Sequence, residues 1–380
     1  MRKLFCWLII LTFFSAGHAQ EVHRLLTDLK SFQNKEGDNR GLFPSFRQYE
    51  YRKSVLKPDD NIFFTALIAW TLRDNLSQLD SIDKKIALSI INEASKVYPN
   101  FQNAKGRPTY NYWKTKPPEV FPNGGLINLL NKKQALPDDL DCTAITMMAM
   151  NASVETVDSV HRLMQGFTNE GGRAKAMLSR YKYFETYSTW FGRKMPVDLD
   201  VCVLSNILVM VNRYQFNYHA ADSAALDFIR LVVEKKDYLD NAGLISGYYQ
   251  RSPVILYHLS RLMQGKNYPA LETYRKQLVE DALTLYNRSG RFMDKVLLST
   301  SLMRWGARPP VDSTITTKSF EEVVSDDHFV FFIANMGVIA GYPYNKWLSR
   351  SGVGRFNYYC PAYNYALLLE NDLLWKKLFP

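Results

Sequence analysis

The 380-residue sequence lacks the short motifs that mark several large enzyme classes. It contains no glycine-rich phosphate loop, no recognisable Ser-His-Asp arrangement and no paired Cys-x-x-Cys. Nucleotide-binding proteins and serine hydrolases depend on such motifs to hold phosphate or to activate a nucleophile. Both classes are therefore poor interpretations of this chain.

Cysteine is also scarce, with four residues in the chain. One of them, Cys6, lies in the N-terminal apolar segment. The other three, Cys142, Cys202 and Cys360, allow at most one disulfide bond and leave one thiol over. We expect buried, reduced thiols, because free cysteine is among the most buried residue types.

Long apolar runs are absent beyond the N-terminus. Residues 1–19 look like a secretory signal peptide, with two basic residues, an apolar core over residues 4–14 and small residues before the expected cleavage site. That core is too short to span a membrane, which takes about 20 apolar residues. We therefore expect a single domain over residues 20–380, exported to the periplasm or out of the cell, without a transmembrane segment.

A basic stripe is missing too. Without the two basic residues of the signal peptide, 45 of the 47 basic residues remain against 37 acidic ones, a net charge of +8. The excess is scattered in short pairs such as Lys132-Lys133 and Lys235-Lys236. Because a nucleic-acid-binding protein gathers its basic residues on one element, we expect no nucleic-acid partner.

Helical periodicity is present almost throughout, with apolar residues three and four positions apart. Few segments alternate in the way that marks β-strands. The periodicity predicts about a dozen helices, with uncertain ends. They cover residues 22–34, 60–75, 82–98, 139–151, 154–166, 198–213, 221–236, 252–264, 269–286, 293–304, 320–338 and 361–375.

The expected helices are of two kinds. Those charged on one face include residues 81–97, 223–236 and 271–286. Those apolar nearly all round include residues 62–70, 143–150, 201–211, 254–259 and 363–369. A helix without a polar face must be buried on all sides, so the alternation predicts an inner and an outer layer. We therefore expect an all-α fold, an (α/α)6 toroid of about six helical hairpins.

Aspartates gather where the apolar helices begin. The core Pro-x-Asp-Leu-Asp occurs at residues 137–141 and again at residues 196–200, with a looser copy at residues 58–61. Inner helices of a double layer run parallel, so their N-termini open onto one mouth. The aspartates expected to meet there are Asp139, Asp141, Asp198 and Asp200.

Long loops rich in aromatic residues precede several of the same helices. Loops of this length inside a compact domain are usually functional. Their flat aromatic faces can stack on sugar rings or stabilise cations. The binding residues expected on this ground are Trp113, Trp190, Tyr248, Tyr249, Trp347 and Tyr358.

These motifs resemble those of the terpenoid cyclase and protein prenyltransferase α/α toroids, in an exported bacterial branch. Residues 139–144, Asp-Leu-Asp-Cys-Thr-Ala, are similar to the Asp-x-Asp-Asp-Thr-Ala signature of cation-initiating cyclases, whose middle aspartate is the acid. Residues 29–43 resemble the Gln-x-x-Asp-Gly turn after an outer helix of that fold. Cys142 replaces the last aspartate of the signature. The architecture also resembles six-hairpin glycosidases and polysaccharide lyases, which are often exported.

The paired carboxyl groups point to acid–base chemistry. Two like charges in a partly dry mouth raise one pKa of the pair, and an acid beside an ionised carboxylate is what glycoside hydrolysis needs. Helix capping is the structural alternative for each aspartate. We expect the protein to bind or process a glycan or similar polar polymer fragment, or another small-molecule ligand. If it is an enzyme, we expect a carboxylate-dependent glycoside hydrolase or lyase.

Two alternatives stay open. Asp200-Val201-Cys202 and Tyr257-His258 are similar to the zinc ligands of prenyltransferase catalytic subunits. That resemblance implies a zinc ion held by Asp200, Cys202 and His258, in an enzyme for isoprenoid or lipid substrates. Without zinc we expect no cofactor. The second alternative is an interaction scaffold without catalysis, in which the aspartates only cap helices.

Overall fold

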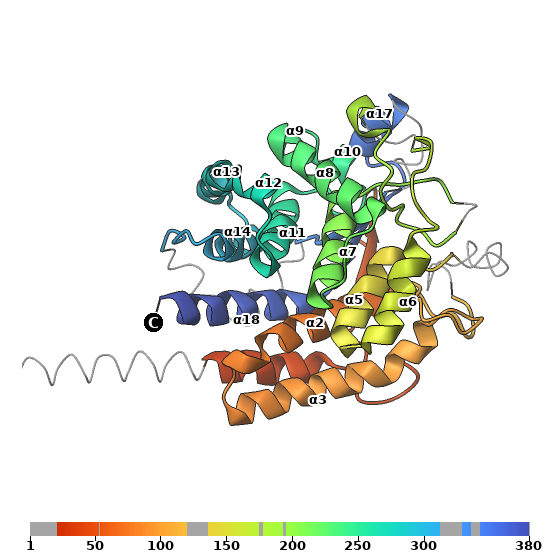
Figure 1. Ribbon diagram of the computed structural model, residues 1–380. Coiled ribbons are helices and arrows are strands. Elements are labelled where there is room, and N and C mark those ends of the chain that lie inside the picture. Colours follow the sequence, from red (N-terminus) through yellow and green to blue (C-terminus); the bar gives the residue numbers. More distant parts are fainter. Residues whose placement is uncertain are drawn as a thin grey trace, which may run out of the picture.

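The computed structural model describes residues 21–52, 54–119, 136–174, 178–192, 195–311, 329–335 and 343–379. These residues are mostly helical, which confirms the helical prediction in its coarse form (Figure 1). The expected signal peptide lies outside the described residues. No helix among the residues that are described is both long and apolar enough to cross a membrane.

Six helices pack against one another in the order in which they follow along the chain. They are α2 (Ile62–Asn75), α5 (Leu140–Met150), α7 (Val201–Arg213), α11 (Ser252–Gly265), α14 (Phe292–Arg304) and α18 (Pro361–Leu378). The last of them, α18, also packs against α2, and the two lie side by side in Figure 1. The contacts between neighbouring helices therefore lead from α2 to α18 and back to α2.

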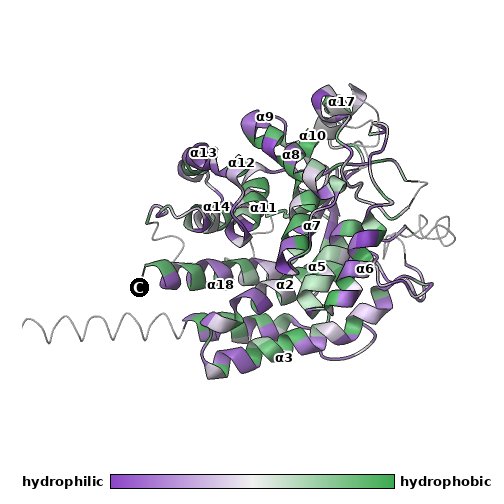
Figure 2. Ribbon diagram, viewed as in Figure 1, coloured by the Kyte–Doolittle hydropathy of each residue, from purple (hydrophilic) through white to green (hydrophobic). Residues whose placement is uncertain are grey.

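The inner helices are buried on nearly all sides, as their sequences predict. Ten of the eleven residues of α5 are buried, and in α2 only Arg73 and Asp74 are not. Figure 2 shows α5 in pale and green colours, without a hydrophilic face. This burial confirms the interpretation of the apolar sequences.

Other helices cover this layer and bury only one face. α3 (Ser81–Val97) packs on α2, α8 (Ala220–Glu234) on α7, and α13 (Arg275–Arg288) on α14. In α13 the buried residues Leu278, Ala282 and Tyr286 are four positions apart, so they lie on one side of the helix. The remaining helical elements are α6 (Val154–Met164), α9 (Asp237–Asp240), α10 (Ala242–Ile245), α12 (Pro269–Glu272), α17 (Tyr344–Ser351), residues 21–32, and the 3-10 turns η1 (Leu76–Gln78), η2 (Tyr98–Phe101) and η3 (Ser179–Tyr181).

Polar side chains fix where three inner helices begin. Asn61, Asp139 and Asp200 are the N-caps of α2, α5 and α7, and each accepts a hydrogen bond from a backbone amide in the first turn. Such a cap satisfies an amide that has no partner within the helix. The three helix starts therefore carry polar groups on short, rigidly held side chains.

A four-stranded antiparallel sheet is the main departure from the all-α expectation. Its strands are β1 (Phe46–Tyr49), β2 (Leu56–Pro58), β3 (Phe332–Asn335) and β4 (Arg355–Tyr359), in the order β2-β1-β4-β3. Phe46 pairs with Tyr359, and Phe332 with Tyr358. Since β2 runs into α2 and β4 into α18, the sheet lies at the N-terminal ends of these helices.

The expected helix over residues 320–338 is wrong where the structure describes it. Residues 332–335 form β3, whose backbone bonds to β4. The segment from Phe329 to Asn335 contains three phenylalanines and two β-branched residues, which favour a strand at least as strongly as a helix. Its partner strand supplies the hydrogen bonds that decide between the two.

Candidate functional site

A pocket with a volume of about 160 Å³ lies where the inner helices begin and the sheet meets them. About 10–15 Å³ holds one water molecule, so the pocket has room for about ten waters or one small ring-shaped ligand. Its lining combines the first turns of α2, α5 and α7 with the segment before α11 and with β3 and β4. The starts of α2, α5 and α7 thus meet at this pocket.

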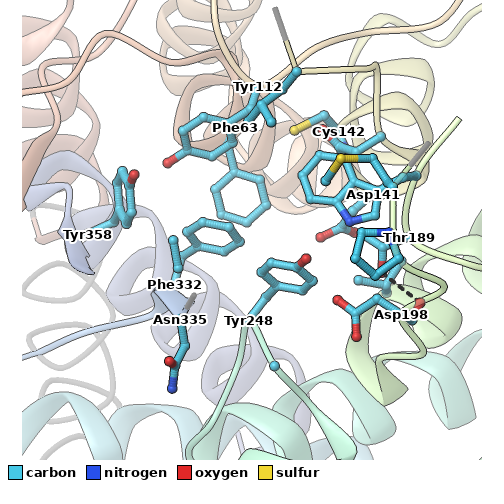
Figure 3. A pocket seen from close by; sticks show the side chains of 18 of the residues that line it. Phe63, Tyr112, Asp141, Cys142, Thr189, Asp198, Tyr248, Phe332, Asn335 and Tyr358 are labelled. Atoms are coloured by element: carbon cyan, nitrogen blue, oxygen red, sulfur yellow. Dashed lines mark hydrogen bonds between the residues drawn. The ribbon is translucent and has the colours of Figure 1, made fainter. Parts of the chain in front are cut away.

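Aromatic side chains make up much of the lining. Phe332 is at their centre: its ring lies 4.8 Å from that of Phe63 and stacks on Tyr112 at 5.4 Å and on Tyr248 at 5.8 Å. Figure 3 shows these rings facing one another, with the carboxyl groups of Asp141 and Asp198 on the far side of the space. The aromatic residues of the lining are Phe63, Tyr112, Trp113, Trp190, Tyr248, Phe332 and Tyr358.

Asp139 lines the pocket and also begins α5. One carboxyl oxygen accepts the backbone amide of Cys142 at 2.6 Å. Burial raises the pKa of Asp139 to about 8, against the lowering effect of that amide, and the nearby Asp141 adds to the rise. The Asp139 carboxyl is therefore protonated at neutral pH and can donate a proton.

Asp141 lies two residues further along α5, inside the pocket. Asn206 of α7 donates to one of its oxygens at 2.8 Å, and the hydroxyl of Tyr249 donates to the other. Burial raises the pKa of Asp141 to about 7, while the bonds from Tyr249 and Asn206 lower it. Two donors from separate elements thus hold this carboxyl in one orientation.

Asp198 reaches the pocket from the segment before α7 and is only half-buried. Its backbone carbonyl accepts the amide of Thr189 at 2.9 Å, which fixes the segment. Loss of water raises the pKa of Asp198 to about 7, and a hydrogen bond from Tyr248 lowers it. Trp190 in turn contacts Tyr248, with ring centroids 6.2 Å apart and the rings nearly perpendicular.

The structure places Asp200 outside the pocket lining, although the sequence groups it with the other three aspartates. It caps α7 through the amides of Cys202 and Val203, and its second oxygen accepts the hydroxyl of Ser246 and the amide of Tyr248. The two Asp-x-Asp pairs are out of register, because the N-cap of α5 is the first aspartate of its pair and the N-cap of α7 is the second. Asp200 is a structural carboxylate that supports Tyr248.

The expected aromatic residues lie in three different places. Trp113, Trp190, Tyr248 and Tyr358 line the pocket. Tyr249 is fully buried behind it and acts through Asp141. Trp347 lies on α17 with 81% of its side chain exposed, so the binding role expected for it has no support from its position.

The described residues do not form the expected zinc site. No three His, Cys, Asp or Glu side chains among them are arranged to hold a metal ion. Asp200 already accepts four hydrogen bonds. In His258, Nδ1 bonds to the carbonyl of Val254 at 2.8 Å.

Three aromatic residues of the lining are not among the residues that the sequence predicts for the site. Phe63 and Phe332 belong to apolar stretches that look like ordinary core, and Tyr112 lies next to the predicted Trp113 in a loop rich in aromatic residues. The hydroxyl of Tyr112 is buried and has no hydrogen-bond partner among the described residues. Phe63 could have been recognised by its position: it lies two residues after the N-cap of α2, just as Asp141 lies two residues after the N-cap of α5.

The arrangement supports chemistry in which positive charge is bound or develops. Three carboxyl groups with pKa values near neutrality can give or take protons. The faces of the aromatic rings attract a cation, or stack on a flat or ring-shaped ligand.

The sequence was compared with protein-family models and with curated proteins. No protein-family model matches the sequence, and no curated protein is significantly similar to it. The function therefore has to be argued from the pocket itself.

Proposed function

We propose that the protein is an exported (α/α)6 toroid, of the terpenoid cyclase-like kind, that binds a glycan fragment in this pocket and processes it by acid–base catalysis. The unbroken order of contacts from α2 to α18 and back to α2 supports the toroid. The observation that carries the function is that three carboxyl groups and aromatic residues at seven positions line one cavity of about 160 Å³. Glycosidases use the same two kinds of group, one for proton transfer and one for stacking.

The carboxyl groups take different roles in this proposal. Asp139 has the highest pKa of the three and donates a proton to the leaving glycosidic oxygen. Asp198, half-buried and bonded to Tyr248, acts as the carboxylate that removes a proton from the attacking water. Because Asp139 must be protonated and Asp198 ionised, the rate is expected to be highest between about pH 7 and pH 8.

One observation favours a second function, a cyclase-like reaction on an isoprenoid substrate. Asp141, which matches the acid of the cyclase signature, lies among Phe63, Tyr112 and Val203 in a mostly apolar pocket. Aromatic faces there would stabilise a carbocation. The two functions differ in the ligand that the pocket takes up.

The test is calorimetric binding of neutral oligosaccharides and of an isoprenoid alcohol to the purified protein. Trp190→Ala should weaken oligosaccharide binding about tenfold, because Trp190 lines the pocket and a stacking contact is lost. Trp347→Ala is the matched control, since that tryptophan is exposed on α17 and should leave affinity unchanged.

Turnover is measured on the same oligosaccharides by the release of reducing ends. Asp139→Asn and Asp198→Asn should each lower the rate at least about a hundredfold, the usual worth of a general acid or base. Unchanged turnover in both variants would overturn the catalytic roles. Binding of the isoprenoid alone, or of neither ligand, would overturn the glycan proposal.

A further inference from the structure

The charges that line the pocket are of one sign. Its charged lining residues are Asp139, Asp141 and Asp198, and no lysine, arginine or histidine is among the described residues that line it. Behind the wall, Arg47 of β1 is held 2.5 Å from Asp59 in a buried ion pair. Once ionised, these carboxyl groups offer a bound ligand negative charge, and none of the described lining residues is a competing cation.

The aromatic rings complement this charge. The stacked series Tyr112, Phe332 and Tyr248 presents ring faces and edges from a loop, from β3 and from the segment before α11. A ring face carries partial negative charge and attracts an ammonium group within about 6 Å. Carboxylates and aromatic faces together are the usual surroundings of a bound organic cation.

We propose that the ligand of this pocket is a cationic glycan unit, an amino sugar with a free ammonium group, and not its N-acetylated or neutral counterpart. This inference rests on the proposed function and names its substrate class. N-acetylation removes the positive charge, and with it the attraction to the three carboxyl groups and to the aromatic faces.

Binding of this ligand releases protons. The pKa values of Asp139, Asp141 and Asp198 lie at about 8, 7 and 7, so these groups are largely protonated in the empty pocket at pH 6.5. A cation placed among them favours the ionised form. The other titratable or charged groups that face them are Cys142, Tyr112, Tyr248 and Tyr358 in the lining, and Asp59, Asp138, Asp200, Arg47, Arg107, Cys202 and Tyr249 behind it.

The experiment is titration calorimetry at pH 6.5 with β-linked tetramers of glucosamine, N-acetylglucosamine and glucose, in two buffers of different ionisation enthalpy. The glucosamine tetramer is expected to bind at least about tenfold more tightly than the other two, with a heat that depends on the buffer because protons are released. Asp198→Asn should abolish most of this preference. Asp227→Asn is the matched control, because its carboxyl is 64% exposed on α8 and it should leave the preference intact.

The outcomes separate the two proposals. Equal binding of the three tetramers, with the same effect of Trp190→Ala on each, would overturn the cationic ligand and leave the glycan function standing. A preference that survives in Asp198→Asn, without proton release, would also overturn it. Binding of none of the tetramers would overturn the glycan function itself.

Discussion

The three carboxyl groups of the pocket are held at a cost in stability. A free aspartate ionises with a pKa of about 3.9. Burial moves this value up by several units at Asp139 and Asp141, because the protein surroundings solvate the charge less well than water does. Carboxyl groups in this state are common at functional sites and rare elsewhere, so the pocket is distinguished at the level of single residues.

Asp139→Asn should change how stability depends on pH. The folded protein keeps the proton on Asp139 up to about pH 8, whereas the unfolded chain loses it near pH 4. The contribution of this group to stability is therefore fully present below pH 4 and is lost as the pH rises towards 8, by up to about 1.4 kcal/mol per pH unit. Asparagine mimics the protonated form and caps a helix equally well.

The measurement is the free energy of unfolding by denaturant between pH 6.5 and pH 8. This window avoids His258, whose depressed pKa gives the opposite sign below pH 6.5. The variant should lose stability less steeply than the wild type, and should be the more stable protein at pH 8. Parallel curves for the two proteins would contradict a raised pKa at Asp139.

At the scale of elements, the start of α7 is joined to the segment before α11 by one carboxylate. Asp200 uses one oxygen for the first turn of α7 and the other for Ser246 and the amide of Tyr248. The side chain thus positions Tyr248, a wall of the pocket, without touching the space inside. Both carboxyl oxygens of Asp200 must accept hydrogen bonds, which explains why the N-cap of α7 is an aspartate, whereas the N-cap of α2 is Asn61.

Asp200→Asn should destabilise the protein by about 2 kcal/mol, because the new amide nitrogen faces a donor and leaves buried groups unpaired. Asp80 provides a matched control. It caps α3 through the amides of Ile82 and Asp83, but it is exposed and has no second element to hold. Asp80→Asn should change stability by less than about 0.5 kcal/mol, since asparagine is as good an N-cap. Equal effects in chemical unfolding would argue against the bridging role of Asp200.

The helices could be predicted from the sequence, whereas the sheet could not. Periodicity is a local property, and it places α2, α3 and α18 within a few residues of their observed ends. The strands β1 and β4 are short and about 300 residues apart, so their pairing depends on the fold that brings them together. Residues 329–335, which include β3, do not alternate between polar and apolar side chains, so the sequence does not mark them as a strand.

The lining of the pocket could be predicted in part, in its three carboxyl groups and in four of its seven aromatic residues. Aspartates at the start of apolar helices are unusual enough to be noticed, and Asp139 and Asp141 do line the pocket. Phe332 could not be recognised, because a phenylalanine in an apolar run looks the same whether it faces the core or a cavity. The sequence groups Asp200 with the site because the two Asp-x-Asp pairs look alike. In the structure, however, the N-cap of α5 is the first aspartate of its pair and the N-cap of α7 is the second.

At the scale of the whole molecule, the pocket carboxyl groups and two buried guanidinium groups lie at different ends of inner helices. Acidic side chains lie at the starts of α5 and α7, and the guanidinium groups of Arg261 and Arg304 lie in the C-terminal halves of α11 and α14. Helix N-termini carry partial positive charge and C-termini partial negative charge, so each group lies where the helix dipoles favour it. Arg261 and Arg304 are therefore buried in the same layer as the pocket without lining it.

One carboxylate connects these arginines to the rest of the layer. Glu370 of α18 accepts a hydrogen bond from Arg304 of α14 and one at 2.5 Å from Tyr257 of α11. Arg261 lies 3.9 Å from the same carboxylate and packs 4.1 Å from the ring centroid of Trp70 in α2. Side chains from four of the six inner helices, α2, α11, α14 and α18, therefore gather around the Glu370 carboxylate.

Glu370→Gln should lower the free energy of unfolding by about 3–5 kcal/mol, because it leaves two buried guanidinium groups without a counter-charge. Glu280→Gln on α13 is the matched control: its side chain is 63% exposed in a loose pair with Lys276, and its loss should cost less than about 1 kcal/mol. None of the residues around Glu370 lines the pocket, so ligand affinity of the folded variant should stay at the wild-type value. If the Glu370→Gln variant kept its stability but no longer bound the ligand, the charges around Glu370 would be coupled to the carboxyl groups of the pocket. That result would contradict the placement argued from the helix dipoles.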